Sequence, residues 1–365
     1  MTAHPEFSAS AIAELKRLDK QLTQVDELAP GIIACRFSPQ DNASLVTNFL
    51  RNVLQHRPTF VRHIAPVQAT IDLTNSARDL EEIAAALAEL PTMALLERGT
   101  HFAVQTRLAQ TDKTLGERPY SSGKINQALA EAIGEETGAA EDVKKPQVVV
   151  SLLCTMHKAY LGISPVEENL SAWPGGSRHF AQTPEQISRA EFKLLEALEV
   201  FGIELPSQGR TLDLGAAPGG WTRIALEAGL HVVAVDPARL DNRLVKHKRL
   251  DHYRGYAEDY LEEAIRKRYR FDVIMNDMRM DARDAARLLV KVSPCLKADG
   301  FVLSVFKLPH ATLEISPVIT LKEALNILKQ CYSVVQARQL FHNRQEVTVV
   351  AAQVRSLRTH TFNHI

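Results

Sequence analysis

The sequence contains few cysteines, and they form no pairs. Cys35, Cys154, Cys295 and Cys331 lie far apart, and none belongs to a Cys-x-x-Cys motif. This spacing argues against a zinc knuckle and against a framework of disulfide bonds. A reducing, cytoplasmic environment therefore fits the cysteine content best, and we expect no metal site.

The sequence also lacks an excess of charge of either sign and any long apolar run. Lys plus Arg and Asp plus Glu each number 43, so contact with a polyanion would depend on a local basic patch. Residues 1–20 contain acidic and polar side chains where a signal peptide needs an apolar run, and no later segment reaches membrane-spanning length. We expect no membrane association and make no prediction of oligomeric state.

The composition is otherwise that of a globular protein, at a length that favours two domains. The 365 residues are 45% hydrophobic and 24% charged, and no tract is of low complexity. Between Ser164 and Pro184 the sequence becomes rich in Pro, Gly, Ser and Asn, as linkers are. We expect a domain over 1–165, a linker over 166–184 and a second domain over 185–365.

The first domain has the pattern of an α+β fold. Alternating or continuous apolar residues predict strands over 102–107, 147–154 and 159–162, and helical spacing predicts a helix over 121–134. A strand over 31–37 and a helix over 44–54 are also indicated, but the first ninety residues carry no motif of recognisable chemistry.

The second domain has the alternating pattern of an α/β fold. We expect strands over 211–215, 231–235, 271–276, 300–306, 334–340 and 347–353, with helical patterns between the earlier ones. The last two strands are too close in sequence for a parallel crossover, which needs a dozen or more residues. The sequence therefore predicts a doubly wound sheet that ends in an antiparallel hairpin.

The stretch TLDLGAAPGGWT, residues 211–222, indicates a cofactor site. A buried strand leads into a glycine turn that opens a helix, the arrangement that cradles a nucleotide. Asp236 ends the next strand and suits ribose hydroxyls, but Pro218 lacks the N–H that would help hold a pyrophosphate. This favours S-adenosylmethionine, which has no phosphate. The candidate cofactor residues are Asp213, Gly215, Ala216, Pro218, Gly219, Gly220, Trp221, Asp236, Asp259 and Asp277.

Asp259 and four further polar residues each have a local explanation as well as a functional one. Asp259 suits an adenine amino group or caps a helix. Lys193 follows the capping box Ser188-x-x-Glu191 on a helix flank, Asp277 can cap the next helix, Lys307 can be a surface lysine, and Glu346 can pair with Arg338 or Arg344. Together, however, these four at the strand ends of one fold favour a shared catalytic role.

Five segments resemble the successive motifs of the FtsJ-like RNA ribose 2′-O-methyltransferases over about 185–355: SRAEFKLLEA, LDLGAAPGGWT, FDVIMNDM, FVLSVFKL and RQEVTVVA. The resemblance implies the class I methyltransferase variation of the Rossmann fold, S-adenosylmethionine as cofactor, and a catalytic tetrad of Lys193, Asp277, Lys307 and Glu346.

The N-terminal segments KKPQVVVSLL and KAYLGIS resemble the THUMP domain, an RNA-binding module. Within the FtsJ-like family the chain is most similar to the RlmM type, which methylates a cytidine ribose in large-subunit rRNA. RNA is therefore the expected partner.

Ribose methylation gives each member of the tetrad a reason. The enzyme must align the 2′-oxygen with the methyl group and remove a proton as the oxygen attacks. We assign Lys307 as the proton acceptor once it is neutral, Asp277 and Glu346 as orienting carboxylates, and Lys193 as a positioning cation. The residues could exchange the base and orienting roles.

Other functions remain as alternatives. After Asp277 the chain has Met-Arg-Met where many FtsJ-like proteins have Ala-Pro, which makes Arg279 a candidate for phosphate contact. No Asn-Pro-Pro-Tyr motif supports base N-methylation, and Cys295 precedes a strand as a core residue would. The same fold could methylate a small molecule, or serve as a catalytically silent RNA-binding or ribosome-assembly protein. The basic run from Arg243 to Arg254 is either a solvated helix face or an RNA contact.

Overall fold

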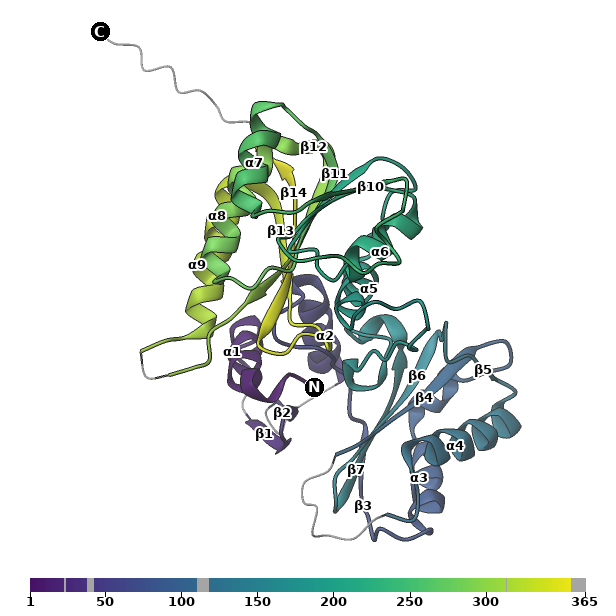
Figure 1. Ribbon diagram of the computed structural model, residues 1–365. Coiled ribbons are helices and arrows are strands. Elements are labelled where there is room, and N and C mark those ends of the chain that lie inside the picture. The colour runs from purple at the N-terminus through teal and green to yellow at the C-terminus, as the bar shows by residue number, and fades with distance from the viewer. Residues whose placement is uncertain (23, 38–42, 110–117, 313, 356–365) are drawn as a thin grey trace. The chain divides into compact units, whose positions relative to one another are not determined.

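The structure is a computed structural model that describes residues 1–22, 24–37, 43–109, 118–312 and 314–355 (Figure 1). The chain forms two compact units, Met1–His179 and Phe180–Ile365. Each unit has its own sheet and its own hydrophobic core, and each is described separately below.

The first unit begins with a small helical and hairpin region. Its elements are η1 (Pro5–Phe7), α1 (Ser8–Leu18), β1 (Gln24–Ala29), β2 (Ile32–Arg36) and α2 (Ala43–His56). The strand and helix expected at 31–37 and 44–54 are confirmed, and β1 pairs with β2 in antiparallel fashion. The rings of Phe7 and Phe60 stack 4.8 Å apart and are buried, so this region has apolar packing of its own.

The rest of the first unit is a mixed sheet covered by helices. Its strands are β3 (Ala69–Asp72), β4 (His101–Leu108), β5 (Ala140–Glu141), β6 (Val148–Cys154) and β7 (Lys158–Pro165), and its helices are α3 (Asp79–Ala88), η2 (Pro91–Leu95), α4 (Ser122–Thr137), η3 (Val166–Glu168) and η4 (Pro174–Gly176). The strand order is β3-β7-β6-β4-β5, with β4 parallel to β5 and β6, and β7 antiparallel to β3 and β6.

Helices α3 and α4 lie beside one another on this sheet (Figure 1). Ile83 and Leu87 from α3 and Ile125 and Leu129 from α4 are buried in one core with the sheet residues. The α+β expectation for this region is therefore confirmed. The apolar residues whose spacing predicted α4 lie on the side of the helix that faces the core.

The second unit is a doubly wound sheet. Its strands are β8 (Arg210–Leu214), β9 (His231–Val235), β10 (Leu250–Tyr253), β11 (Phe271–Asn276), β12 (Leu296–Lys307), β13 (Tyr332–Arg338) and β14 (Glu346–Val354). Its helices are α5 (Ala190–Phe201), α6 (Gly220–Ala228), α7 (Ala257–Arg266), α8 (Ala282–Val292), η5 (Ser293–Cys295) and α9 (Pro317–Cys331).

The strand order in the described part of this sheet is β10-β9-β8-β11-β12-β14-β13, and β14 is antiparallel to both of its neighbours. Helices α5 and α6 cover one face, and α7, α8 and α9 cover the other (Figure 1). The expected α/β architecture with an antiparallel terminal hairpin is confirmed. Strand β10 was not predicted, because Leu250-Asp-His-Tyr253 is a short, polar edge strand that pairs with β9.

This topology reverses the direction of strand order at the carboxyl ends of the central strands. The chain leaves β8 toward β9 on one side and returns to β11 on the other. In open α/β sheets such a reversal of strand order is where ligands bind. Both the glycine turn after β8 and Asp277 after β11 lie at this point.

Tyr332 at the start of β13 gives a test of the packing. Its side chain is fully buried, and its hydroxyl donates to the carbonyl of Leu289 in α8 over 2.7 Å. We expect Tyr332→Phe to lower the free energy of unfolding by about 1 kcal/mol, because it leaves a buried acceptor with one partner fewer. Urea denaturation measures this. Tyr256→Phe, at a residue that is 66% exposed, is the matched control, and equal effects of the two variants would contradict the prediction.

Candidate active site

Two lysines and two carboxylates meet at the carboxyl ends of the second unit's strands. Lys193 comes from α5, Asp277 follows β11, Lys307 ends β12 and Glu346 begins β14. Nζ of Lys193 lies 2.7 Å from Oε2 of Glu346 and 3.5 Å from Oδ2 of Asp277. Nζ of Lys307 lies 2.9 Å from Oε1 of Glu346 and also contacts Oδ1 of Asp277. Each lysine thus contacts both carboxylates, and the four charges alternate around a ring.

The sheet explains how three of these residues meet. Lys307 and Glu346 are directly opposite one another in the antiparallel pair β12 and β14. The backbone N–H of Asp277 donates to the carbonyl of Leu214 at the end of β8, 3.3 Å away, which holds Asp277 beside the glycine turn. Lys193, in contrast, lies on a helix outside the sheet. The tetrad residues named from the sequence are brought together.

The local explanations for Asp277 and Glu346 are wrong. Helix α8 is capped by Asp281, whose Oδ1 accepts from the backbone N–H of Arg283 over 2.8 Å. Across the terminal hairpin Arg338 faces Thr348, whereas Glu346 pairs with lysines. The strand register puts Lys307, and not an arginine, opposite Glu346, and so determines which residue Glu346 pairs with.

The expected capping box at the start of α5 is half present. Oε1 of Glu191 accepts from the backbone N–H groups of Ile187 and Ser188, at 2.7 and 3.3 Å. The helix begins at Ala190, however, and no side chain caps its first turn. Lys193 therefore follows a genuine helix start, but its side chain is 18% exposed and paired instead of solvated.

The charges of the ring stabilise one another. The four side chains are only 16–21% exposed. Burial alone lowers the pKa of Lys193, but the carboxylates of Asp277 and Glu346 outweigh it, so this pKa lies above its usual value. Burial raises the pKa of Glu346, but Lys307 and Lys193 outweigh it, so this pKa lies below its usual value. Lys193 and Glu346 are therefore charged at neutral pH.

The glycine turn connects β8 to α6 beside this ring. Gly215 and Gly219 have left-handed φ values of 73° and 114°, which side chains rarely allow. A Cβ atom at Gly215 would lie 2.6 Å from Cγ of Met278, and one at Gly219 would lie 2.4 Å from Cδ1 of Leu244. The turn therefore needs glycine at both positions, for its conformation and for its packing.

Asp236 holds this turn from the neighbouring strand. Its Oδ2 accepts from the N–H of Ala217 over 3.0 Å and its Oδ1 from that of Ala238 over 2.8 Å, while the N–H groups of Gly215 and Ala216 donate to the carbonyl of Val235. Pro218 follows a cis peptide bond. Any contact of Asp236 with a ribose would come in addition to this bracing of the turn.

Three other candidate cofactor residues have side chains directed elsewhere or exposed. Asp213 is buried, and Oγ1 of Thr222 donates to its Oδ2 over 2.6 Å. Trp221 is buried, and its Nε1 donates to the carbonyl of Ala190 over 2.7 Å, which ties α6 to α5. Asp259 is exposed in the first turn of α7, whose capping position is Tyr256.

Comparison with known proteins agrees with this geometry. Residues 186–348, which include the whole tetrad, match the family model described as FtsJ-like methyltransferase, and residues 77–164 match the model of the THUMP domain. The chain contains an FtsJ-like methyltransferase domain and a THUMP domain.

The relatives of the chain are ribosomal RNA methyltransferases by name. The "Ribosomal RNA large subunit methyltransferase M" of Halorhodospira halophila is 33% identical over 207 residues, which cover 54% of this chain and 55% of that protein. The protein of the same name from Azotobacter vinelandii is 27% identical over 238 residues, covering 62% and 64%. The chain thus matches little more than half the length of these relatives.

Among solved structures, TrmN from Thermus thermophilus is similar with a TM-score of 0.39 and 18% identity, over 96% of this chain and 98% of that one. The fibrillarin pre-rRNA processing protein from Methanococcus jannaschii has a TM-score of 0.37 and 16% identity, over 59% and 85%. The fold assignment therefore depends on the strand order and the family models above.

Sequence reasoning missed the buried acids of α5 in the FtsJ-like domain. Glu191 is buried, and its Oε2 lies 2.5 Å from a terminal nitrogen of Arg223 on α6. Glu196, also buried, contacts the connection between β13 and β14. The sequence signal was present, since Glu196 lies within the apolar stripe of Leu194, Leu195 and Leu198, where a solvated acid does not belong.

The basic run of the FtsJ-like domain lies in turns and at the two ends of strand β10, so its interpretation as a helix face is wrong. Arg243 pairs with Asp241 at 2.9 Å and donates to the carbonyl of Pro184, and Arg249 donates to the carbonyl of Leu226. Lys246 and Lys248 are exposed.

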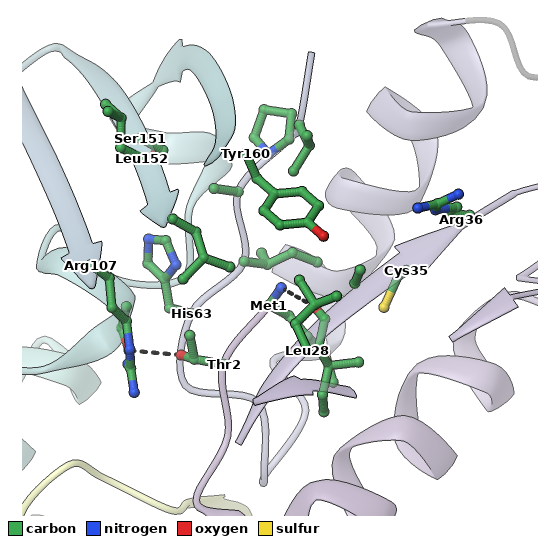
Figure 2. Close-up of a pocket in the computed structure, with 18 of the residues that line it drawn as sticks. Met1, Thr2, Leu28, Cys35, Arg36, His63, Arg107, Ser151, Leu152 and Tyr160 are labelled. Atoms are coloured by element: carbon green, nitrogen blue, oxygen red, sulfur yellow. Dashed lines mark hydrogen bonds between the residues drawn. The ribbon is translucent and has the colours of Figure 1, made fainter. Parts of the chain in front are cut away.

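The first unit contains a cavity of about 850 Å³ where its N-terminal region meets the sheet of the THUMP domain (Figure 2). Phe37 and Phe49 are among the apolar lining residues, and the Tyr160 ring, which comes from β7, projects into the cavity. The polar lining residues include Arg36, His63, Gln105, Arg107, Ser151 and Lys158.

Three of the lining residues carry a buried polar atom without a hydrogen-bond partner: His63 (Nε2), Gln105 (Oε1) and Ser151 (Oγ). Burial lowers the pKa of His63 to about 3, so its ring is neutral. Buried polar atoms normally have a partner, so these three are exceptions, and the residues that carry them form part of the polar lining of the cavity.

The described ranges contain no group of three or more His, Cys, Asp or Glu side chains placed to hold a metal ion. No helix in the described part of the chain combines the length and apolar content that crossing a membrane requires.

Asp213 makes the stability of the FtsJ-like domain depend on pH. Burial, with smaller contributions from Asp277 and Asp236, raises its pKa from 3.8 to about 7 despite the bond from Thr222. Between these two pH values the folded chain keeps a proton that the unfolded chain releases. The free energy of unfolding therefore falls by up to about 1.4 kcal/mol per pH unit as pH rises from about 4 to about 7, and it is level above that.

We expect Asp213→Asn, which keeps an acceptor for Thr222, to remove this slope. Urea denaturation of both proteins at several pH values between 4 and 8 measures it, with the exposed Asp299→Asn as control. Parallel pH profiles for wild type and Asp213→Asn would show that Asp213 ionises normally.

Proposed function

We propose that this protein transfers a methyl group from S-adenosylmethionine to a ribose 2′-hydroxyl of RNA, and that its target is a cytidine of large-subunit rRNA. The ring of Lys193, Asp277, Lys307 and Glu346 beside the glycine turn carries this proposal. The FtsJ-like and THUMP matches and the names of the relatives support it.

The residues beside the glycine turn fit the cofactor. Gly215 and Gly219 hold the turn in its left-handed conformation beside Asp277, and Asp277 and Asp236 are close enough to Asp213 to raise its pKa. Asp236 follows β9 beside the turn, where it would offer an acceptor to a ribose hydroxyl of the cofactor, whereas Pro218 lacks the N–H that would help hold a pyrophosphate. When bound, S-adenosylmethionine supplies a methyl group on a positively charged sulfur.

The ring can align and deprotonate a hydroxyl. Lys193 is held as a cation by Asp277 and Glu346 and suits the positioning role. Lys307 contacts the same two carboxylates from the sheet side. In this proposal Lys307, in its neutral form, accepts the proton of the 2′-hydroxyl as the oxygen attacks the methyl group.

The carboxylates keep their orienting role throughout. Asp277 is fixed by its backbone bond at the end of β8 and Glu346 by the register of β14, so neither needs to move when a proton is transferred. A fixed arrangement of charges lowers the barrier because no reorganisation is required during the reaction.

The first unit supplies the RNA contact in this proposal. We infer domains over 1–165 and 185–365 with a linker over 166–184, and RNA bound by the THUMP domain and the cavity beside it. The Tyr160 ring and the partnerless atoms of His63, Gln105 and Ser151 suit an unpaired base, with a flat apolar face and a polar edge. An rRNA substrate places the reaction in the cytoplasm.

Lys307→Ala tests the reaction. We expect the rate of label transfer from S-adenosylmethionine to 2′-O-methylcytidine in unmodified large-subunit rRNA to fall at least about 100-fold, because the proton acceptor is lost. Lys297→Ala is the matched control, since this lysine lies on the same strand and pairs with Asp272 at 2.9 Å. Nucleoside analysis of the labelled RNA identifies the product.

Other labelled products would contradict the proposed reaction and indicate a different function. Label on a base would indicate a different RNA methylation, and label on metabolites alone would indicate a small-molecule methyltransferase. RNA affinity that is unchanged by Lys307→Ala, with no methylation by either protein, would indicate a silent RNA-binding scaffold.

Tyr160→Ala tests the RNA contact. We expect RNA affinity at fixed salt to fall about 10-fold, because stacking on an aromatic ring contributes about 1–3 kcal/mol per base. Tyr160→Phe keeps the ring and should keep the affinity. Fluorescence anisotropy with a labelled rRNA fragment measures both, and unchanged binding by Tyr160→Ala would place the contact elsewhere.

A further inference from the structure

Glu196 joins helix α5 to the connection between β13 and β14. Its Oε1 accepts from the backbone N–H of Phe341 over 2.7 Å, and its Oε2 accepts from that of His342 over 2.9 Å. Nδ1 of His342 lies 2.7 Å from the same Oε2. Both oxygens of one carboxylate are therefore bound to two consecutive residues of one connection.

This carboxylate is buried, with 2% of Glu196 exposed. A buried carboxylate is costly unless donors satisfy it, and charge-assisted bonds to backbone N–H groups are among the stronger hydrogen bonds in proteins. The three contacts with the connection are therefore a firm attachment and not an incidental surface pair.

The connection itself is internally braced. Nε2 of Gln339 donates to the carbonyls of Asn343 and Arg344, at 3.1 and 3.0 Å. Oδ1 of Asn343 accepts from the N–H of Leu340 over 2.9 Å and from Oγ1 of Thr348 over 3.0 Å. Fixing the position of His342 therefore also restrains the start of β14, where Glu346 lies four residues later.

Aromatic rings make a second attachment at the same place. Phe180, Phe192 and His342 have ring centres 5.4–5.6 Å apart, and Phe192 directly precedes Lys193 on α5. Such ring pairs add to the burial of apolar area.

The attachment lies where the tetrad needs one. Sheet hydrogen bonds and backbone contacts place Asp277, Lys307 and Glu346, but Lys193 belongs to a helix outside the sheet. Glu196 lies three residues after Lys193, within one helical turn. Its bonds therefore fix the helix that carries Lys193 to the connection that leads to Glu346.

We propose that Glu196 is a positioning residue that sets the distance between Lys193 and Glu346. It contacts Phe341 and His342, outside the tetrad, and acts through the placement of α5. The kinetic part of this inference rests on the proposed methyl transfer, whereas its geometric part does not.

Glu196→Gln tests the geometric part. The substitution replaces one acceptor oxygen by an NH₂ donor. This donor faces the backbone N–H groups of the connection and repels them. We expect the Lys193–Glu346 pair to lengthen and the pKa of Lys193 to fall toward its ordinary value, since Asp277 and Glu346 raise it. A pH titration of the lysine side chains by NMR, assigned with Lys193→Arg, reads this without any activity. Glu199→Gln, an exposed residue of the same helix, should leave the titration unchanged.

The kinetic part is tested by comparing the rate of methyl transfer with the affinities for RNA and for S-adenosylmethionine. We expect the single-turnover rate of methyl transfer at saturating RNA to fall about 10–100-fold in Glu196→Gln, since small misplacements of catalytic groups have effects of this size. RNA affinity, S-adenosylmethionine affinity and melting temperature should stay close to those of Glu199→Gln. In a Lys193→Ala background, Glu196→Gln should cause no further loss, because Glu196 acts through Lys193.

The possible results separate the two proposals. An unchanged Lys193 titration in folded Glu196→Gln, or a full additional loss in the Lys193→Ala background, would overturn the positioning role. A wild-type protein that methylates no RNA while Glu196→Gln shifts the Lys193 titration would overturn only the proposed function. If Glu196→Gln does not fold, His342→Ala removes one of the three contacts, and the same titration shift, smaller in size, is expected.

Discussion

The mutual neutralisation of two lysines and two carboxylates is the constraint on which the second unit depends. Four charged groups that are only about one fifth exposed would be unstable singly, because each loses much of its hydration. In the ring each cation contacts both anions, so the loss of any one member leaves a partly buried charge without compensation. The fold must therefore place all four groups close together. The strand ends, the strand register and the contacts of α5 all contribute to this placement.

The sheet and the helix contribute to the ring by different means. Parallel strands bring Asp277 and Lys307 to one edge, and the antiparallel return of β14 places Glu346 opposite Lys307. The helix that carries Lys193 has no such register, and buried acids hold it instead: Glu191 through Arg223 on α6, and Glu196 through the β13–β14 connection. Acids thus serve here as acceptors for backbone and guanidinium groups as well as members of the ring, and Asp236 does the same for the glycine turn.

Much of this could be predicted, and the failures have physical causes. Apolar runs located the central strands because neighbouring residues such as Val273 and Ile274, whose side chains point to opposite faces of the sheet, are both buried. The edge strand β10 lacks that burial and gave no signal. The local explanations for Asp277 and Glu346 failed because sequence proximity does not reveal cross-strand partners. The side chains of Trp221 and Asp213 lie in the most informative motif, yet they bind Ala190 and Thr222 and brace the turn from inside.

The sequence by itself determined the order of strands and helices, the glycine turn, and the residue types that ribose methylation requires, because these follow from local periodicity, backbone conformation and side-chain chemistry. Only the tertiary structure decided which charges meet, which acids are buried as braces, and which lining residues of a cavity in the first unit carry partnerless polar atoms. Those outcomes depend on strand register and on packing between segments distant in the chain, and on the cost of leaving a buried charge or polar atom without a partner, which no single segment can express.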